Sequence, residues 1–90
     1  MAKVEKGTLL KTDGSSESIA PATPKRGYSL SELQGHVGGY IEVVRLPKGK
    51  IMLVNEEGLF MGLPMNARAS EIAGQVIVGN AVVIPSKDLK

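Results

Sequence analysis

The feature that most restricts the fold of this chain is a pair of apolar, β-branched segments joined by a short turn. Residues 40–46 read YIEVVRL and residues 51–54 read IMLV, with PKGK at 47–50 between them. Two such runs around a turn that contains Pro and Gly are typical of an antiparallel β-hairpin. We therefore expect a sheet built on this hairpin.

Two more segments are predicted to add strands to the sheet. Residues 4–11, VEKGTLLK, precede a Thr-Asp-Gly turn, and residues 75–84 carry the apolar run VIVGNAVVI. The Gly79-Asn80 pair inside the second segment predicts a bulge or a sharp bend in that strand.

Capping patterns predict two short helices. In residues 29–37, SLSELQGHV, Ser29 and Glu32 have the spacing of a capping box, and two glycines follow. Asn66 is a suitable N-cap for a second helix over 67–73, which a glycine ends. We expect both helices over one face of a small, mainly antiparallel sheet of four or five strands, which is an α+β fold.

The other segments are predicted to connect these elements within a single domain over residues 1–90. Residues 12–27 contain Ser, Pro and Gly and are expected as a whole to form an ordered loop or a flexible arm, although Ile19 could lie in a short strand. The apolar run LFMGLPM at 59–65 predicts a buried connection, and the polar tail 86–90 is expected to be frayed.

Composition excludes several kinds of site and partner. The chain has no Cys, which rules out disulfides and Cys-based zinc sites. Its net charge of +2 comes from basic residues scattered along the sequence, so we expect no nucleic-acid partner. No long apolar stretch is present, and we therefore expect no membrane span, no secretion signal and a location in the cytoplasm.

The supply of core residues predicts self-association. Apolar residues make up 42% of the chain, but only one Phe and two Tyr are available to fill a core. Because an apolar face buried against a second copy offsets marginal stability, we expect a homo-oligomer.

The start of the second predicted helix is the first candidate binding site. The free N–H groups that follow Asn66 and the positive end of the helix dipole favour anions. Arg68 in the first turn could add a fork of donors for a phosphate or carboxylate, where a purely structural helix prefers Asp or Glu. The alternative is an ordinary capping Asn followed by an exposed Arg.

A polar turn and a glycine pair form the second candidate. The NEEG turn at 55–58 places the Asn55 amide beside two carboxylates, Glu56 and Glu57, a pair that suits acid–base chemistry or a hard cation. The alternative is a solvated turn. Tyr40 follows a Gly-Gly pair that either ends a helix or lets the backbone approach a ligand, with Tyr40 as a packing ring.

The sequence contains no motif for catalysis, a cofactor or a metal. His36 is the only histidine, and no Ser lies in a G-x-S-x-G turn. We therefore expect no enzyme, no cofactor and no metal. Met52, Met61 and Met65 are interpreted as core filler, with an adaptable partner surface as the alternative.

Residues 27–84 resemble a family of small domains of unknown function that is common in phage and mobile-element genomes. The resemblance lies in the segments SLSELQ, GGYIEVV, VNEEG, GLPMNARAS and IVGNAVVI, in that order. It implies an origin and a fold, but no activity. The most recognisable polar positions of the family fall here on Asn55, Glu56, Gly58, Asn66 and Ala69.

Together these features predict a non-enzymatic accessory protein with a counter-defence role. The first expectation is that it binds and sequesters an anionic, nucleotide-type signalling molecule, with Asn66, Arg68, Asn55, Glu56 and Tyr40 as ligand-binding residues. The alternative is a protein that inhibits a host protein by binding it directly. Such a protein would expose an apolar patch of roughly a few hundred Å².

Overall fold

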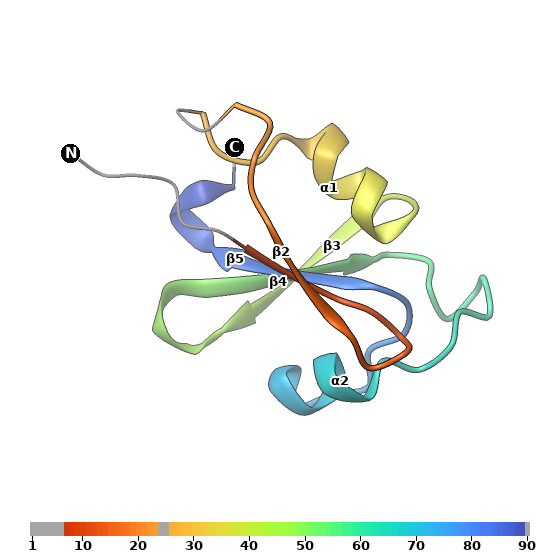
Figure 1. Ribbon diagram of the computed structural model, residues 1–90. Helices are drawn as coiled ribbons and strands as arrows, with labels where there is room; N and C mark the ends of the chain where they lie inside the picture. Colours follow the sequence, from red (N-terminus) through yellow and green to blue (C-terminus); the bar gives the residue numbers. More distant parts are fainter. Residues whose placement is uncertain (1–6, 24–25, 90) are drawn as a thin grey trace.

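The computed structural model describes residues 7–23 and 26–89, which form one antiparallel sheet and two helices (Figure 1). The order of the five strands across the sheet is β2-β1-β5-β4-β3. The elements are β1 Gly7–Leu10, β2 Ser16–Ile19, α1 Leu30–Val37, β3 Ile41–Leu46, β4 Lys50–Asn55, α2 Ala67–Ala73 and β5 Ala81–Pro85, with 3-10 turns at Pro47–Gly49 and Ser86–Asp88. This architecture confirms the predicted α+β fold.

The predicted hairpin is present as β3 and β4. The two strands pair antiparallel from Ile41 opposite Asn55 to Leu46 opposite Lys50. The last strand, β5, lies beside β4 in the same sheet. Residues 4–6 of the first predicted strand lie outside the described residues.

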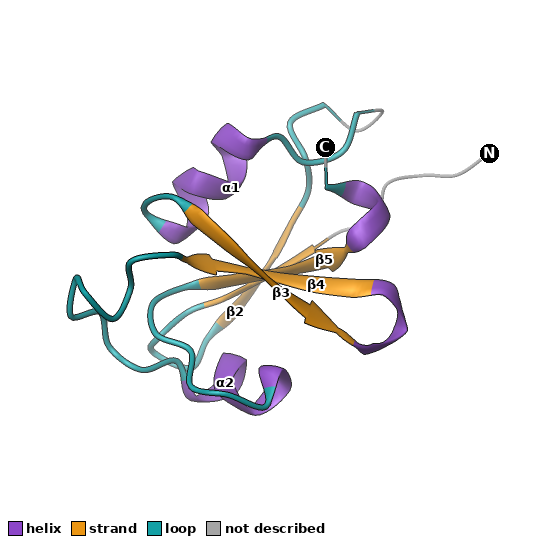
Figure 2. Cartoon of the chain, turned by 180° about the vertical axis from the view of Figure 1, so that it is seen from behind, coloured by secondary structure: helices purple, strands orange, loops and turns teal. Residues whose placement is uncertain are grey.

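The two helices cover opposite faces of the sheet, so the expectation that they share one face is wrong (Figure 2). On β4, Ile51 and Leu53 pack in a cluster with Leu33 of α1, whereas Met52 packs in a second cluster with Ala69 of α2. Successive strand residues point to opposite faces, so the unbroken apolar run of β4 needs cover on both sides.

The helix ends follow the predicted capping. Ser29 Oγ accepts the Glu32 N–H (3.2 Å), and the Glu32 carboxylate accepts the Ser29 N–H (2.9 Å). Asn66 Oδ1 accepts the N–H of Ala69 (3.0 Å) at the start of α2. Both helices end at a glycine in the left-handed region, as predicted.

Residues 12–27 contain a short strand that ends at Ile19, rather than only a loop or an arm. β2 pairs with β1 from Gly7 opposite Ile19 to Leu10 opposite Ser16. Its side chains are mostly exposed, so the segment has no apolar alternation. The backbone ladder with β1 holds it, together with the packing of Ile19 against the core.

Two predictions near the C-terminus need correction. The last strand begins at Ala81 rather than near residue 75, because Gly79 has a positive φ of 78° and turns the chain before it enters the sheet. The tail is not frayed up to Leu89: the carbonyl oxygen of Asp88 accepts the Tyr28 N–H (2.8 Å), and Asp88 is buried.

None of the helices in the described part of the chain has the length and apolarity that a membrane span requires.

Candidate functional site

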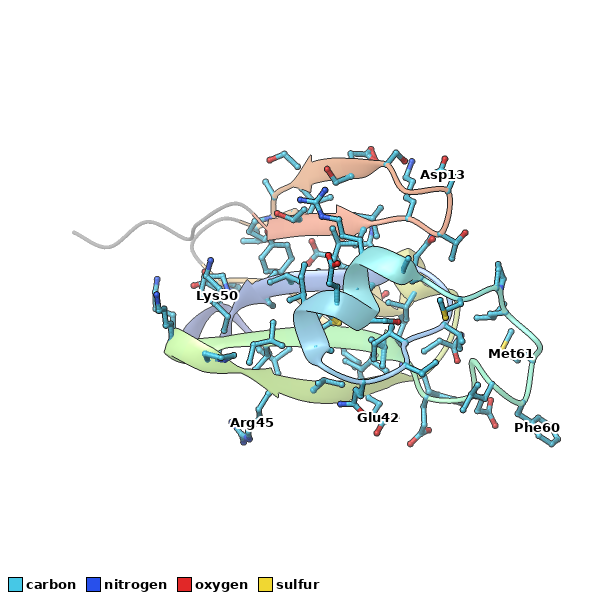
Figure 3. The ribbon with its side chains drawn as sticks, turned by 90° about the horizontal axis from the view of Figure 1, so that it is seen from below. Asp13, Glu42, Arg45, Lys50, Phe60 and Met61 are labelled. Atoms are coloured by element: carbon cyan, nitrogen blue, oxygen red, sulfur yellow. The ribbon has the colours of Figure 1, made fainter. Side chains whose placement is uncertain are left out.

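An exposed apolar loop between β4 and α2 is the most unusual surface feature of the described residues. Leu59 is 79% exposed, Phe60 93% and Met61 53%. Figure 3 shows Phe60 and Met61 on a loop that extends away from the sheet. The expectation that 59–65 is buried is therefore wrong. Helices and connecting segments already cover both faces of the sheet, so these side chains have no core surface to pack against.

Hydrogen bonds hold this apolar loop, which we define as Leu59, Phe60 and Met61, in one conformation. The Met61 N–H donates to the Glu57 carbonyl oxygen (2.8 Å), and the Leu63 N–H donates to that of Gly58 (3.0 Å). Gly58 is itself a close-packed position, since a Cβ there would lie 2.7 Å from Val78 Cγ2. The loop is thus an ordered projection whose apolar side chains face solvent.

Asn55, Glu56 and Tyr40 meet at the base of the apolar loop. The Glu56 N–H donates to the Tyr40 carbonyl oxygen (2.8 Å), which extends the β3–β4 ladder by one pair. The Tyr40 side chain is 67% exposed and lines an open depression together with Met61. The structure therefore brings together three of the five predicted site residues and places them beside apolar side chains.

The Asn55 side chain is buried and has a structural role. Its Nδ2 donates to the Val37 carbonyl oxygen (3.2 Å) at the end of α1, and its Oδ1 accepts the Glu57 N–H (2.8 Å). Its Nδ2 also lies 3.6 Å from Met61 Sδ. Asn55 thus ties α1, the polar turn and the apolar loop together, and its polar atoms are already bonded.

At the candidate site at the start of α2, the hydrogen-bonding groups of the Asn66 side chain are already used within the fold. Asn66 is buried, and its Nδ2 donates to the carbonyl oxygens of Leu10 (3.0 Å) and Gly79 (2.9 Å), while its Oδ1 caps α2. Arg68 is exposed on a helix of only seven residues. The two residues do not converge on a common space, and neither lies with Asn55, Glu56 and Tyr40 at the apolar loop.

The displaced pKa values have structural causes and lie away from the apolar loop. Hydrogen bonds from the backbone of Ser29 and Ala22 lower the pKa of Glu32, and hydrogen bonds from Ser15 lower the pKa of Asp13. Burial raises the pKa of Tyr28. Within the described residues no group of His, Asp and Glu side chains is placed to hold a metal, and no buried side-chain polar atom lacks a hydrogen-bond partner.

The apolar loop was hard to predict from the sequence, although the alternative interpretation of the methionines pointed toward it. Met52 is fully buried as core filler, whereas Met61 and Met65 are exposed, so the interpretation as core filler is wrong for these two. The run LFMGLPM has the composition of a core segment. Only the contacts of its neighbours show that nothing covers it.

The sequence profile of a family described as "Domain of unknown function (DUF3846)" matches residues 7–88. The chain therefore belongs to this family, which agrees with the resemblance to a family without a known activity. No curated protein and no solved structure matches the chain.

Proposed function

We propose that this member of the DUF3846 family is a non-enzymatic accessory protein of a phage or mobile element that acts by binding another protein through the apolar loop. The observation that carries the proposal is the 93% exposure of Phe60 beside the exposed Leu59. Full burial of one such side chain contributes about 1.5–3 kcal/mol, so a partner that covers both gains substantial free energy.

The geometry of the apolar loop suits an anchor for a partner. Binding sites commonly depend on a few aromatic and large apolar side chains that enter pockets on the other protein. The hydrogen bonds from Met61 to Glu57 and from Leu63 to Gly58 hold the loop before binding. Less conformational entropy is then lost when the complex forms.

Protein binding takes precedence over nucleotide sequestration for a specific reason. The sequestration hypothesis needs donors that are available at the start of α2. The Asn66 amide donates both of its hydrogens to the carbonyl oxygens of Leu10 and Gly79, so this side chain has no donor left for an anion. Direct inhibition of a host protein in the host cytoplasm, as a counter-defence measure, is the form of this function that we propose.

Site-specific photo-cross-linking tests the proposal. A benzophenone amino acid replaces Phe60 in one variant and the exposed Glu17, on the opposite edge of the sheet, in a matched control. We expect irradiation in host extract to give a discrete protein adduct from position 60 and none from position 17. The purified partner should then bind the wild-type chain in calorimetry and bind Phe60→Ser at least about tenfold more weakly, a difference of about 1.4 kcal/mol.

Three other outcomes would contradict the proposal. An adduct of twice the mass of the chain would identify a second copy as the occupant, in line with the expected homo-oligomer. Equal adducts from positions 60 and 17 would mean non-specific contact. A large rise in melting temperature with a nucleotide that is later released intact would restore the sequestration hypothesis.

A further inference from the structure

The outer edge of β3 is open for pairing. β3 is the last strand of the sheet and pairs only with β4 among the described segments. The bond from the Glu56 N–H to the Tyr40 carbonyl oxygen makes these two residues a hydrogen-bonded pair of the ladder. Because bonded pairs alternate along an antiparallel ladder, the N–H and C=O groups of Ile41, Val43 and Arg45 point away from β4.

A depression lies beside this edge, on the face of the sheet that carries α2. It has a volume of about 180 Å³, and its apolar wall includes Val44, Leu59 and Val76. Glu42 and Glu56 also line it. Figure 3 shows Glu42 at this edge of the sheet, between Arg45 and Phe60.

The two carboxylates of the depression are available to a ligand. Both Glu42 and Glu56 are exposed, and neither forms an ion pair with another residue of the described ranges. A site with apolar walls and carboxylates beside them is complementary to a lysine or arginine. The aliphatic stem of such a side chain covers apolar surface while its cationic end stays at the solvent boundary.

We propose that β3 binds an extended segment of the partner as a sixth strand, with a lysine or arginine of that segment in the depression. The inference rests on the proposed function in one respect, since it takes the ligand to be a protein. Main-chain bonds to Ile41, Val43 and Arg45 supply affinity that does not depend on sequence, and the depression selects one side chain.

The pleat of the added strand determines which of its residues meet the depression. Alternate side chains of an added strand point to opposite faces, so every second one lies on the same side as Val44 and the depression. The others lie beside Val43, which is partly exposed on the other face. The structure thus favours a segment with a basic residue on one face and apolar or β-branched residues on the other.

A second copy of the chain fits this edge less well. In a symmetric antiparallel pair of β3 strands, residues directly opposite each other lie on the same face of the joined sheet. Glu42 and Arg45 are three positions apart and therefore point to opposite faces. Arg45 of a copy therefore cannot reach Glu42 in such a pair, so the cation of β3 does not match the carboxylates of the depression.

A short synthetic peptide provides the test. It alternates Thr and Val and has one central Lys on the Thr face. The controls are a Lys→Glu peptide and two peptides that are N-methylated at alternate amides, each in a different register. We expect the Lys peptide to shift the amide NMR signals of Ile41, Val43 and Arg45 in the full chain. The Lys→Glu peptide should bind at least about tenfold more weakly, a loss of about 1.4 kcal/mol. One of the two N-methylated peptides is methylated at the amides that would donate to β3, and this peptide should not bind.

Variants of the chain separate the two parts of the site. Glu42→Lys should reverse the preference in favour of the Lys→Glu peptide, whereas Glu17→Lys on the β2 edge should change nothing. Val43→Pro removes an outward N–H that the native ladder does not use, so the chain should fold and bind no peptide. If Val43→Pro does not fold, the N-methylated peptides still test the main-chain bonds.

The inference is overturned if the Lys and Glu peptides bind equally, if N-methylation has no effect in either register, or if the shifts fall outside β3 and the depression. Self-association through β3 without peptide binding would also overturn it. The lining of the depression includes Leu59 of the apolar loop but not Phe60, so peptide binding and cross-linking from position 60 report on different side chains. If the peptide does not bind β3 as expected, the cross-linking result from position 60 still stands. If position 60 gives no adduct, the result of the peptide test still stands.

Discussion

At the scale of single residues, two buried polar side chains connect backbone segments that are distant in sequence. The fully buried Tyr28 hydroxyl accepts the Gly7 N–H (2.8 Å) and donates to the Ile19 carbonyl oxygen (3.1 Å). It therefore ties the start of β1 and the end of β2 to the segment before α1. Asn66 does the same for β1, α2 and the turn at Gly79.

Replacement of Tyr28 by Phe should destabilise the chain without disturbing its packing. The aromatic ring stays, but two buried backbone groups lose their partner, and we expect a loss of about 1–3 kcal/mol in the free energy of unfolding. Urea denaturation measures this value. Tyr40→Phe is the matched control, and its exposed hydroxyl should contribute less than about 0.5 kcal/mol. Equal effects of the two substitutions would contradict the bridging role of Tyr28.

The same Tyr28→Phe variant tests how the free energy of unfolding depends on pH in the alkaline range. Burial raises the folded-state pKa of Tyr28 above its unfolded value of about 10. The stability that the protonated hydroxyl contributes is therefore fully present below about pH 10 and is lost as pH rises through the folded pKa. The difference in unfolding free energy between wild type and Tyr28→Phe should shrink in that range. A difference that does not change with pH would refute the assignment.

Asn66 should prove to be a structural residue rather than a ligand contact. Asn66→Ala removes the cap of α2, worth about 1 kcal/mol, and leaves two buried carbonyl oxygens without a donor, for a total loss of about 2–4 kcal/mol. Asn66→Asp keeps the capping oxygen and loses the donors. If the melting curve of Asn66→Asp matches that of the wild type, the amide donors have no such role.

At the scale of secondary-structure elements, apolar patterning predicted strands better than it predicted their surroundings. The run IMLV indicated β4, but the absence of alternation was also a sign that both faces of this strand are covered. β2 was only weakly indicated by the sequence, because its exposed residues have no periodic apolar pattern. The 3-10 turn at Ser86–Asp88 was not predicted, because it is held by a hydrogen bond to the distant residue Tyr28.

Gly27→Ala should detach the C-terminal turn from the segment before α1. Gly27 has a φ of 78°, and a Cβ there would collide with the carbonyl oxygen of Asp88. The matched control is Gly14→Ala, since Gly14 has a φ of 92° and no atom within 4 Å of an added Cβ. Gly14→Ala should cost about 1–2 kcal/mol from backbone strain alone, and Gly27→Ala should cost more.

Hydrogen exchange at the amide of Tyr28 reports the detachment in Gly27→Ala, because that N–H donates to Asp88. Exchange should accelerate in Gly27→Ala and not in Gly14→Ala. Equal costs and equal exchange in the two variants would show that the packing against Asp88 contributes nothing.

At the scale of the whole molecule, stability and binding surface should be separable. Phe60 is almost fully exposed, so Phe60→Ser should leave the free energy of unfolding within about 0.5 kcal/mol of the wild type. By contrast, Leu33→Ala in the core should cost about 2–5 kcal/mol. Thermal denaturation and retention on a hydrophobic-interaction column measure the two properties. A strongly destabilised Phe60→Ser variant would mean that the loop supports the fold.

The amino-acid sequence was sufficient to predict the elements whose signals are local. The β3–β4 hairpin, the Ser29–Glu32 capping box and the Asn66 cap each depend on residues within a few positions of one another, and all are confirmed. The meeting of Tyr40, Asn55 and Glu56 in one place was also within reach, because a hairpin brings its two ends together.

Which surfaces are covered depends on the three-dimensional arrangement of the elements. The apolar loop has core-like composition and yet is exposed, because α1 and α2 already cover the two clusters of core residues on opposite faces of the sheet. The Asn66 amide binds the carbonyl oxygens of Leu10 and Gly79 rather than a ligand, since the fold places β1 beside the start of α2. Burial depends on what lies opposite a residue in space, and no pattern along the chain contains that information.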